Sequence, residues 1–228
     1  MAKLIYQGKT KDVFENTDGT YTLMLKDDAT GKDGIFDPGE NAVGLRIEGL
    51  GRASLKLSRY YFEKLTAAGV PNHYINSDIG NATMHVLPGT IFGGGLEFIC
   101  RCRAAGSFLK RYGAYAACGM DLDYFVEVTL KDDERQDPQI TKEALVLLGI
   151  MTAAEYDLCA ELTRKIAGLI AADLEEKGLE LYDIKFEFGK NGDEIILIDE
   201  LSGGCMRVYQ GDRLVPPMEL GRVVLVES

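Results

Sequence analysis

The first thirty residues alternate apolar and polar side chains in the manner of β-strands. Residues 4–14 and 20–26 follow this pattern on either side of an Asp-Gly turn, which predicts a β-hairpin. Lys9 and Lys11 are two positions apart, so on a strand they would share one face. The Gly-, Pro- and Asp-rich stretch 27–51 that follows predicts a loop.

Two longer segments have the apolar spacing of amphipathic helices. The first begins near Arg52 and ends before the stop signal Gly69-Val70-Pro71. The second, 152–177, opens with a capping-box sequence, Thr152-Ala-Ala-Glu155, and carries a continuous apolar stripe. Shorter helices are expected at 105–113 and 141–148.

The remaining apolar runs predict strands. These runs cover residues 73–87, 96–103, 125–130, 182–189 and 194–200. The resulting order of strands, one helix, strands and a long helix before a final hairpin indicates an α+β protein with mixed or antiparallel sheets. We expect two lobes around a cleft rather than a doubly wound sheet.

Charged residues fall on one face of the predicted strand 182–189. Alternation places Asp183, Lys185 and Glu187 together, opposite a face of aromatic and aliphatic side chains. A solvated sheet face is the simplest interpretation. The next strand, however, ends in Asp199 and Glu200, and acids at the end of a buried strand are common ligand groups.

The register of this last hairpin decides whether Glu187 and Asp199 meet. A two-residue Asn191-Gly192 loop would place them on opposite faces, whereas a three-residue loop, 191–193, sets Lys185 opposite Asp199 and brings the two carboxylates together. We predict the three-residue loop. Two carboxylates there would suit Mg²⁺, a hard ion that prefers oxygen ligands and is shared with nucleotide phosphates.

The predicted strand 96–103 combines cations with apolar residues. Its alternation puts Arg101 on the face opposite Cys100 and Cys102, so that the cysteines face the core. Ser107 follows near the start of a short helix, where its hydroxyl and a guanidinium fork from Arg101 could bind an anion. Ser107 as a simple helix cap is the alternative.

The charge balance limits the classes of partner. The chain of 228 residues carries 36 acidic and 25 basic side chains, a formal net charge of −11, which argues against nucleic-acid and membrane-surface binding. The segment 121–183 holds 16 acids against 6 bases, while 94–113 is locally basic. The acidic net charge is therefore compatible with a small anionic ligand bound in a basic cleft.

The sequence shows no recognisable targeting signal and no CxxC pair of cysteines. There is no apolar run of membrane-spanning length and no signal-peptide pattern at the N-terminus, which predicts a cytoplasmic protein. Five scattered cysteines without CxxC spacing predict buried, reduced thiols rather than a disulfide framework.

Taken together, these segments resemble the phosphoribosylaminoimidazole-succinocarboxamide synthase (SAICAR synthetase) family. The resemblance extends over residues 4–207, and its most specific elements are R-x-x-x-A-G-S and D-x-K-x-E-F-G. The matching blocks are YQGKTKDVF at 6–14, KDDAT at 26–30, FEKLTAAGVP at 62–71, RCRAAGSFLKRYG at 101–113, VEVTLKDDERQDPQI at 126–140, YDIKFEFG at 182–189 and IDELS at 198–202.

The resemblance implies an ATP-dependent ligase of purine biosynthesis. It would join 5-amino-1-(5-phosphoribosyl)imidazole-4-carboxylate to L-aspartate and release ADP and phosphate, with ATP and Mg²⁺ as cofactors. The implied fold has a β-rich nucleotide-binding lobe, 1–90, and an α+β substrate- and metal-binding lobe, 91–228, with the ATP cleft between them. A homodimer is also implied.

Site residues follow from the same resemblance, position by position. Lys9, Lys11 and Lys131 would contact ATP, and Glu187 and Asp199 would hold Mg²⁺. The imidazole nucleotide would bind Arg101, Ser107, Asp137 and Arg207. The implied catalytic residues are Lys11, Asp183 and Lys185.

The chain also departs from the family pattern. Leu50 stands where the family has the lysine of a G-K-G element, and Ser54 and Leu55 replace paired asparagines. The loop before Arg207 reads Ser-Gly-Gly-Cys-Met and lacks the family's Pro and Asp. Two alternatives thus stay open: a paralogous ligase with another substrate, and a nucleotide-binding protein without turnover.

Overall fold

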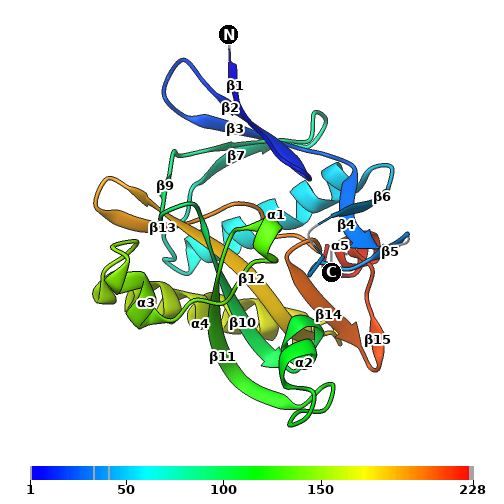
Figure 1. Cartoon of the computed structure of the whole chain (residues 1–228). Coiled ribbons are helices and arrows are strands. Elements are labelled where there is room, and N and C mark those ends of the chain that lie inside the picture. Colours follow the sequence, from blue (N-terminus) through cyan, green and yellow to red (C-terminus); the bar gives the residue numbers. More distant parts are fainter. Residues whose placement is uncertain (1, 33, 41, 226–228) are drawn as a thin grey trace. The chain divides into compact units, whose positions relative to one another are not determined.

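The structure is a computed structural model that describes residues 2–32, 34–40 and 42–225 (Figure 1). It divides into two units. The first unit contains the described residues of Met1–Gly89, Glu200–Cys205 and Val215–Ser228, and the second contains Thr90–Asp199 and Met206–Leu214. The expectation of one boundary near residue 90 therefore needs correction at the C-terminal end, where the chain returns twice to the first unit.

The first unit is built on a five-stranded antiparallel sheet in the order β1-β2-β3-β8-β7. A smaller antiparallel sheet has the order β5-β4-β6. The bounds are β1 Lys3–Gln7, β2 Lys11–Glu15, β3 Tyr21–Leu25, β4 Asp28–Lys32, β5 Ile35–Phe36, β6 Val43–Arg46, β7 Tyr74–Asp78 and β8 Thr83–Val86.

Two helices complete the first unit. Helix α1, Leu50–Ala67, buries Leu55, Phe62 and Leu65, three residues of the stripe expected from the sequence. Helix α5, Pro217–Val224, packs against α1. The sequence pattern did not indicate α5, because eight residues that begin with Pro217 give too short a periodic signal.

Two expectations for the first unit were wrong. The stretch 27–51 contains β4, β5 and β6 rather than only loop, because short strands that include Gly and Asp show no clear alternation. Lys9 lies in the bend between β1 and β2, so Lys9 and Lys11 do not share a strand face.

The second unit is a seven-stranded antiparallel sheet. Its main order is β11-β10-β12-β14-β15, and β13 and β9 also pair with β12. The strand bounds are β9 Thr90–Ile91, β10 Leu96–Arg103, β11 Asp121–Leu130, β12 Glu180–Asn191, β13 Glu194–Ile198, β14 Met206–Gln210 and β15 Arg213–Leu214.

Helix α4 forms the hydrophobic layer of this unit. It spans Ala153–Glu175 and packs on β10, β11 and β12 (Figure 1). The expected capping box is present, since Thr152 accepts from the Glu155 N–H and the Glu155 carboxylate accepts from the Thr152 N–H. The shorter helices are α2 Gly106–Tyr112, the 3₁₀ turn Asp133–Arg135 and α3 Lys142–Leu147. The predicted α+β class with antiparallel sheets is confirmed.

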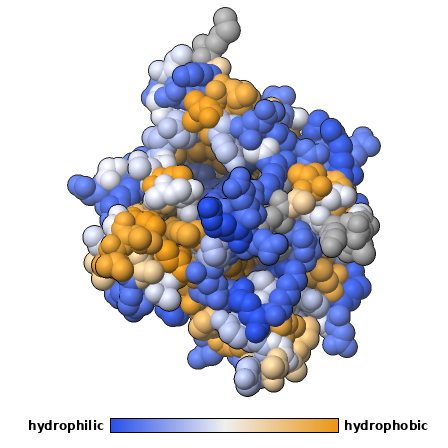
Figure 2. Space-filling model, viewed as in Figure 1, coloured by the Kyte–Doolittle hydropathy of each residue, from blue (hydrophilic) through white to orange (hydrophobic). Residues whose placement is uncertain are grey.

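The surface is mostly hydrophilic in the view of Figure 2, with an apolar patch on the side where Figure 1 shows α3. Val146, Leu147 and Leu148 at the end of α3 are all exposed, Leu147 by 87%. None of the described helices is long and apolar enough to cross a membrane.

Candidate active site

Three neighbouring strands of the second unit bring charged residues into one row. The pairing of β10 with β12 sets Arg101 opposite Asp183, and the pairing of β12 with β14 sets Asp183 opposite Arg207. Asp183 accepts hydrogen bonds from Arg101 Nη1 at 3.1 Å and Arg207 Nη1 at 2.9 Å. One carboxylate thus bridges two guanidinium groups that lie more than 100 residues apart in sequence.

Arg101 is the centre of this cluster and is almost completely buried. Its Nε and Nη2 donate to Glu127 at 2.8 and 2.6 Å, and Nη2 also donates to Ser107 Oγ at 2.8 Å. Nη1 donates to Asp183 and, at 3.5 Å, to the Ala105 carbonyl. All five N–H donors of the guanidinium are therefore engaged within the protein.

The sequence pattern did not indicate Glu127 on β11 as a site residue, although its carboxylate holds several side chains of the cluster together. Its carboxylate accepts from Arg101, from Arg111 Nη2 at 2.6 and 2.7 Å, and from Gln139 at 2.6 Å. The only signal in the sequence was a charged residue between Val126 and Val128, in a run that is otherwise apolar. A buried carboxylate of this kind is stable because its lone pairs are all satisfied by cationic or amide donors.

Gly106 allows Arg207 to reach the cluster. Its φ is +52°, and a Cβ at this position would lie 2.7 Å from the guanidinium carbon of Arg207. A side chain at this position would have to displace the Arg207 guanidinium, and its backbone would be strained at this positive φ. The glycine in the A-G-S element is thus required by the close approach of Arg207, despite the changed loop that precedes this arginine.

Ser107 is the second residue of α2, and Ala105 is the N-cap. The alternative that Ser107 merely caps this helix is wrong, since its side chain accepts from Arg101 instead. Arg101 and Ser107 are therefore in contact, as expected. Arg101 is buried, however, rather than exposed on an open face.

Lys185 lies two residues after Asp183 on β12. Its Nζ donates to Glu97 at 2.8 Å, and Glu97 also accepts from Thr129. Burial alone would lower the pKa of Lys185, but the carboxylates of Glu97, Glu187 and Asp199 outweigh it and raise the pKa above its ordinary value. Lys185 is consequently an ammonium group at neutral pH and supplies positive charge rather than a base.

The predicted hairpin register is wrong. Glu187 pairs with Ile198 and Asn191 with Glu194, so the turn consists of Gly192 and Asp193 alone. Continued strand geometry would put Asp199 on the face opposite Glu187. The strand ends at Ile198, however, and Asp199 adopts φ +72°, which breaks the alternation.

Both carboxylates nevertheless act on the same ammonium group. The negative charges of Glu187 and Asp199 both contribute to the raised pKa of Lys185, after that of Glu97. Glu187 is buried and accepts from Lys131 Nζ at 2.6 Å. Among residues 2–32, 34–40 and 42–225, no three His, Cys, Asp or Glu side chains could together hold a metal ion. Two carboxylates suffice for Mg²⁺ when nucleotide phosphates supply further oxygens, so these residues fit that ion.

The lysines of the first unit differ in their surroundings. Lys11, at the start of β2, forms an ion pair with Glu200, a residue that sequence reasoning noted only as a neighbour of Asp199. Lys9 is exposed in the bend before it. The preceding residue, Gly8, donates its N–H to the Lys11 carbonyl at 2.8 Å, which holds the bend in a tight conformation.

Asp137 organises the loop after β11. Its carboxylate accepts the Asp132 N–H at 2.7 Å, and its own N–H donates to the Asp132 carbonyl at 3.0 Å. The side chain therefore fixes the loop that follows Lys131. Direct contact between Asp137 and the arginine cluster is not seen among the described residues.

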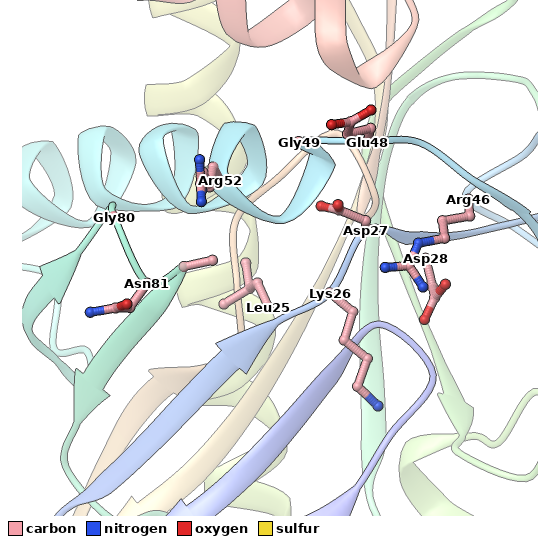
Figure 3. A pocket seen from close by; sticks show the side chains of 11 residues that line it. Leu25, Lys26, Asp27, Asp28, Arg46, Glu48, Gly49, Arg52, Gly80 and Asn81 are labelled. Carbon is pink, nitrogen blue, oxygen red and sulfur yellow. The ribbon is translucent and has the colours of Figure 1, made fainter.

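A polar pocket of about 480 Å³ lies in the first unit (Figure 3). Lys26, Asp27, Asp28, Arg46, Glu48 and Arg52 contribute charged side chains to it. Asp27 accepts the Gly51 N–H at 3.0 Å, and this hydrogen bond at the start of α1 lowers the pKa of Asp27. The pocket was not indicated by the sequence because its residues come from short strands and turns.

The five cysteines are free, as expected, but only Cys100 and Cys159 are buried, and Cys118 is exposed. Burial raises the pKa of Cys159 to about 12. Interaction with Cys102, together with burial, also raises the pKa of Cys100, so neither buried thiol is a thiolate at neutral pH.

Known proteins are similar to this chain in sequence and in fold. The family model described as SAICAR synthetase matches residues 4–217. The phosphoribosylaminoimidazole-succinocarboxamide synthase of Clostridium tetani is 54% identical over 97% of this chain and 99% of the relative.

Solved structures of SAICAR synthetases have a fold similar to that of this chain. A SAICAR synthetase (type 2) in complex with ADP has a TM-score of 0.80 and 30% identity, with 92% of this chain and 86% of that chain covered. The phosphoribosylaminoimidazole-succinocarboxamide synthase of Ehrlichia chaffeensis has a TM-score of 0.81 and 25% identity over the same shares. The chain therefore belongs to the SAICAR synthetase family.

Proposed function

We propose that this chain is an ATP-dependent carbon–nitrogen ligase that condenses 5-amino-1-(5-phosphoribosyl)imidazole-4-carboxylate with L-aspartate to form SAICAR, ADP and phosphate. The observation that carries this function is the 54% identity to a synthase of that name over nearly the full length of both chains. The changed loop before Arg207 does not prevent this side chain from donating to Asp183, which also accepts from Arg101.

The chemistry requires positive charge around transferring phosphate. A carboxylate reacts with an amine only after one of its oxygens becomes a leaving group, which phosphorylation by ATP achieves. We assign Lys9, Lys11 and Lys131 to the nucleotide phosphates. Lys185, held as an ammonium group by its carboxylate neighbours, would offset the charge that develops on the phosphoryl group.

The arginine cluster suits the imidazole nucleotide. Ser107 and Arg207 would contact it, while Arg101 and Asp183 hold these two side chains in position. Asp137 would line the same site from the loop after Lys131. This division of roles follows from the burial of Arg101 and the engagement of all its donors.

Glu187 and Asp199 would hold Mg²⁺, which supplies charge neutralisation at the phosphates when bound. Lys131 and Lys185 compensate these carboxylates in the present structure. The homodimer and the cytoplasmic location stay predictions from the sequence.

The test is an assay of ADP release with ATP, Mg²⁺, the imidazole nucleotide and L-aspartate. We expect stoichiometric ADP and SAICAR, and no sustained ADP release when aspartate is omitted. ADP release only with another acid or amine would favour the paralogous ligase, and nucleotide binding without any turnover would contradict an enzymatic role. Glu187→Gln and Asp199→Asn should abolish Mg²⁺-dependent turnover in a folded protein, with Glu194→Gln, an exposed acid of the same hairpin, as the control.

A further inference from the structure

The bend between β1 and β2, residues 8–10, is held in shape by Lys26, the residue that follows β3. The Lys26 N–H donates to the Thr10 carbonyl at 2.8 Å, and Lys26 Nζ donates to the Gly8 carbonyl at 2.9 Å. The bend is closed by the Gly8 N–H, which donates to the Lys11 carbonyl at 2.8 Å. Lys26 thus contacts both ends of the bend, one through its backbone and the other through its side chain.

The ammonium group of Lys26 is also paired with an acid of low exposure. Its Nζ lies 2.6 Å from Oδ1 of Asp12, the second residue of β2. The Asp12 side chain is 11% exposed and that of Lys26 is 22% exposed. Water and salt screen such a partly buried pair much less than a surface pair, so the attraction keeps the Lys26 side chain against the bend.

The Lys26 side chain does not extend into the polar pocket that this residue lines. Figure 3 shows it pointing away from Asp27 and Arg52. Its positive charge is balanced by Asp12, and its ammonium group is engaged by the Gly8 carbonyl. Lys26 is therefore suited to hold the bend in place rather than to bind a phosphate group itself.

The bend carries two of the lysines that we assign to the nucleotide phosphates. Lys9 lies within it and Lys11 follows it directly. The conformation leaves little space, since a Cβ on Gly8 would lie 2.8 Å from the Lys11 carbonyl oxygen and 2.8 Å from the ring of Tyr6. Phosphoryl transfer depends on cations that are already in place, and a misplacement of about 1 Å can cost about 100-fold in rate.

We propose that Lys26 and Asp12 are positioning residues that hold Lys9 and Lys11 in the arrangement that binds the nucleotide phosphates. This inference rests on the assignment of these two lysines in the proposed function. It predicts the sign of an effect. Asp12→Asn removes a negative charge near anionic phosphates, so electrostatic attraction alone would make nucleotide binding tighter, whereas loss of positioning makes it weaker.

The experiment measures the Kd of ADP in the presence of Mg²⁺ by calorimetry, without turnover, on the full chain. We expect Asp12→Asn and Lys26→Met each to raise this Kd by about tenfold, because the phosphate lysines are displaced. Lys26→Arg keeps a cation at this position and should lie between Lys26→Met and wild type. The control is Arg59→Met, which removes the ion pair of Arg59 with Glu63 on α1, where both side chains are about half exposed, and it should bind ADP as wild type does.

A second measurement separates positioning from a general loss of stability. In the ADP-release assay, Asp12→Asn and Lys26→Met should raise KM for ATP and lower kcat, while KM for the imidazole nucleotide, which we assign to the second unit, stays at the wild-type value. ADP binding that is unchanged or tighter in Asp12→Asn, or an equal rise in both KM values, would overturn the inference. A wild type that binds ADP but releases none from ATP would instead count against the proposed function.

Discussion

At the scale of single residues, Glu127 matters most for the buried charges. Glu127→Gln leaves the guanidinium of Arg101 buried with one carboxylate fewer, and it also weakens the hold on Arg111. Removing one partner of a buried ion pair costs about 3–5 kcal/mol, because the remaining charge is poorly compensated. We expect a loss of that order in the free energy of unfolding, measured by urea denaturation.

The exposed pair of Arg103 with Glu180 provides the comparison for Glu127. Glu180→Gln removes a carboxylate from the same sheet, but both side chains of this pair reach solvent. Exposed ion pairs contribute about 1 kcal/mol or less. Equal destabilisation by the two substitutions would show that burial of Arg101 is not what makes Glu127 important.

The raised pKa of Lys185 predicts a pH dependence of stability. A lysine whose pKa is higher in the folded than in the unfolded chain stabilises the fold fully below its unfolded pKa of about 10.4, and this contribution declines as the pH rises above that value. Lys185→Met should therefore be less stable than wild type at pH 7 to 9, and the difference should narrow above pH 10.4. Urea denaturation from pH 7 to 11 measures it. A difference that grows with pH would contradict the assigned direction.

The sequence predicted which of these residues lie on one strand face, but not how deeply they are buried. Alternation correctly grouped Asp183, Lys185 and Glu187, because period-two geometry is local to one strand. The burial of Arg101 depends on Glu127 from β11 and on α2, which are long-range contacts. No pattern within a single segment encodes them, so the resemblance to a family supplied residue roles that periodicity could not.

At the scale of elements, the start of α2 depends on Gly106. Gly106→Ala would strain a backbone with φ +52° and push the Arg207 guanidinium away from Asp183. We expect lower stability and a higher KM for the imidazole nucleotide, measured by thermal denaturation and by the ADP-release assay. Gly168→Ala is the matched control, since Gly168 lies within α4 and its added Cβ meets no atom within 4 Å. That substitution should stabilise the helix by about 0.5–1 kcal/mol.

The elements also show where sequence patterns succeed and fail. Helix α4 was predicted because its capping box and apolar stripe are strong local signals, and β10 matched the predicted 96–103. The β12–β13 register was mispredicted by one residue, since Asn191 still pairs with Glu194 and leaves a two-residue turn at Gly192-Asp193. Local composition does not determine whether this turn has two or three residues. The face on which the Asp199 side chain lies then depends on the backbone conformation of that residue.

At the scale of the whole molecule, the distribution of charge explains how an acidic chain can bind anionic substrates. The net charge is −11, yet the second unit gathers the guanidinium groups of Arg101, Arg111 and Arg207 in one cluster. The acids that dominate the total are concentrated in 121–183, and many of them are exposed on α4 and on the loop after β11. Small phosphorylated ligands respond to the local field, so the total charge opposes polyanions without opposing the proposed substrates.

The path of the chain makes the first unit dependent on its C-terminal helix. Leu220 of α5 is buried in this unit, where α5 packs on α1. Leu220→Ala should cost about 2–5 kcal/mol through lost burial and the cavity left behind. Because the loss falls in the first unit, hydrogen exchange should accelerate in α1 and leave α4 protected.

Leu169→Ala, at an exposed leucine of α4, is the control and should change the free energy of unfolding by less than about 1 kcal/mol. Equal acceleration in α1 and α4 would mean that the two units unfold together, so that the division of the chain describes contacts but not stability.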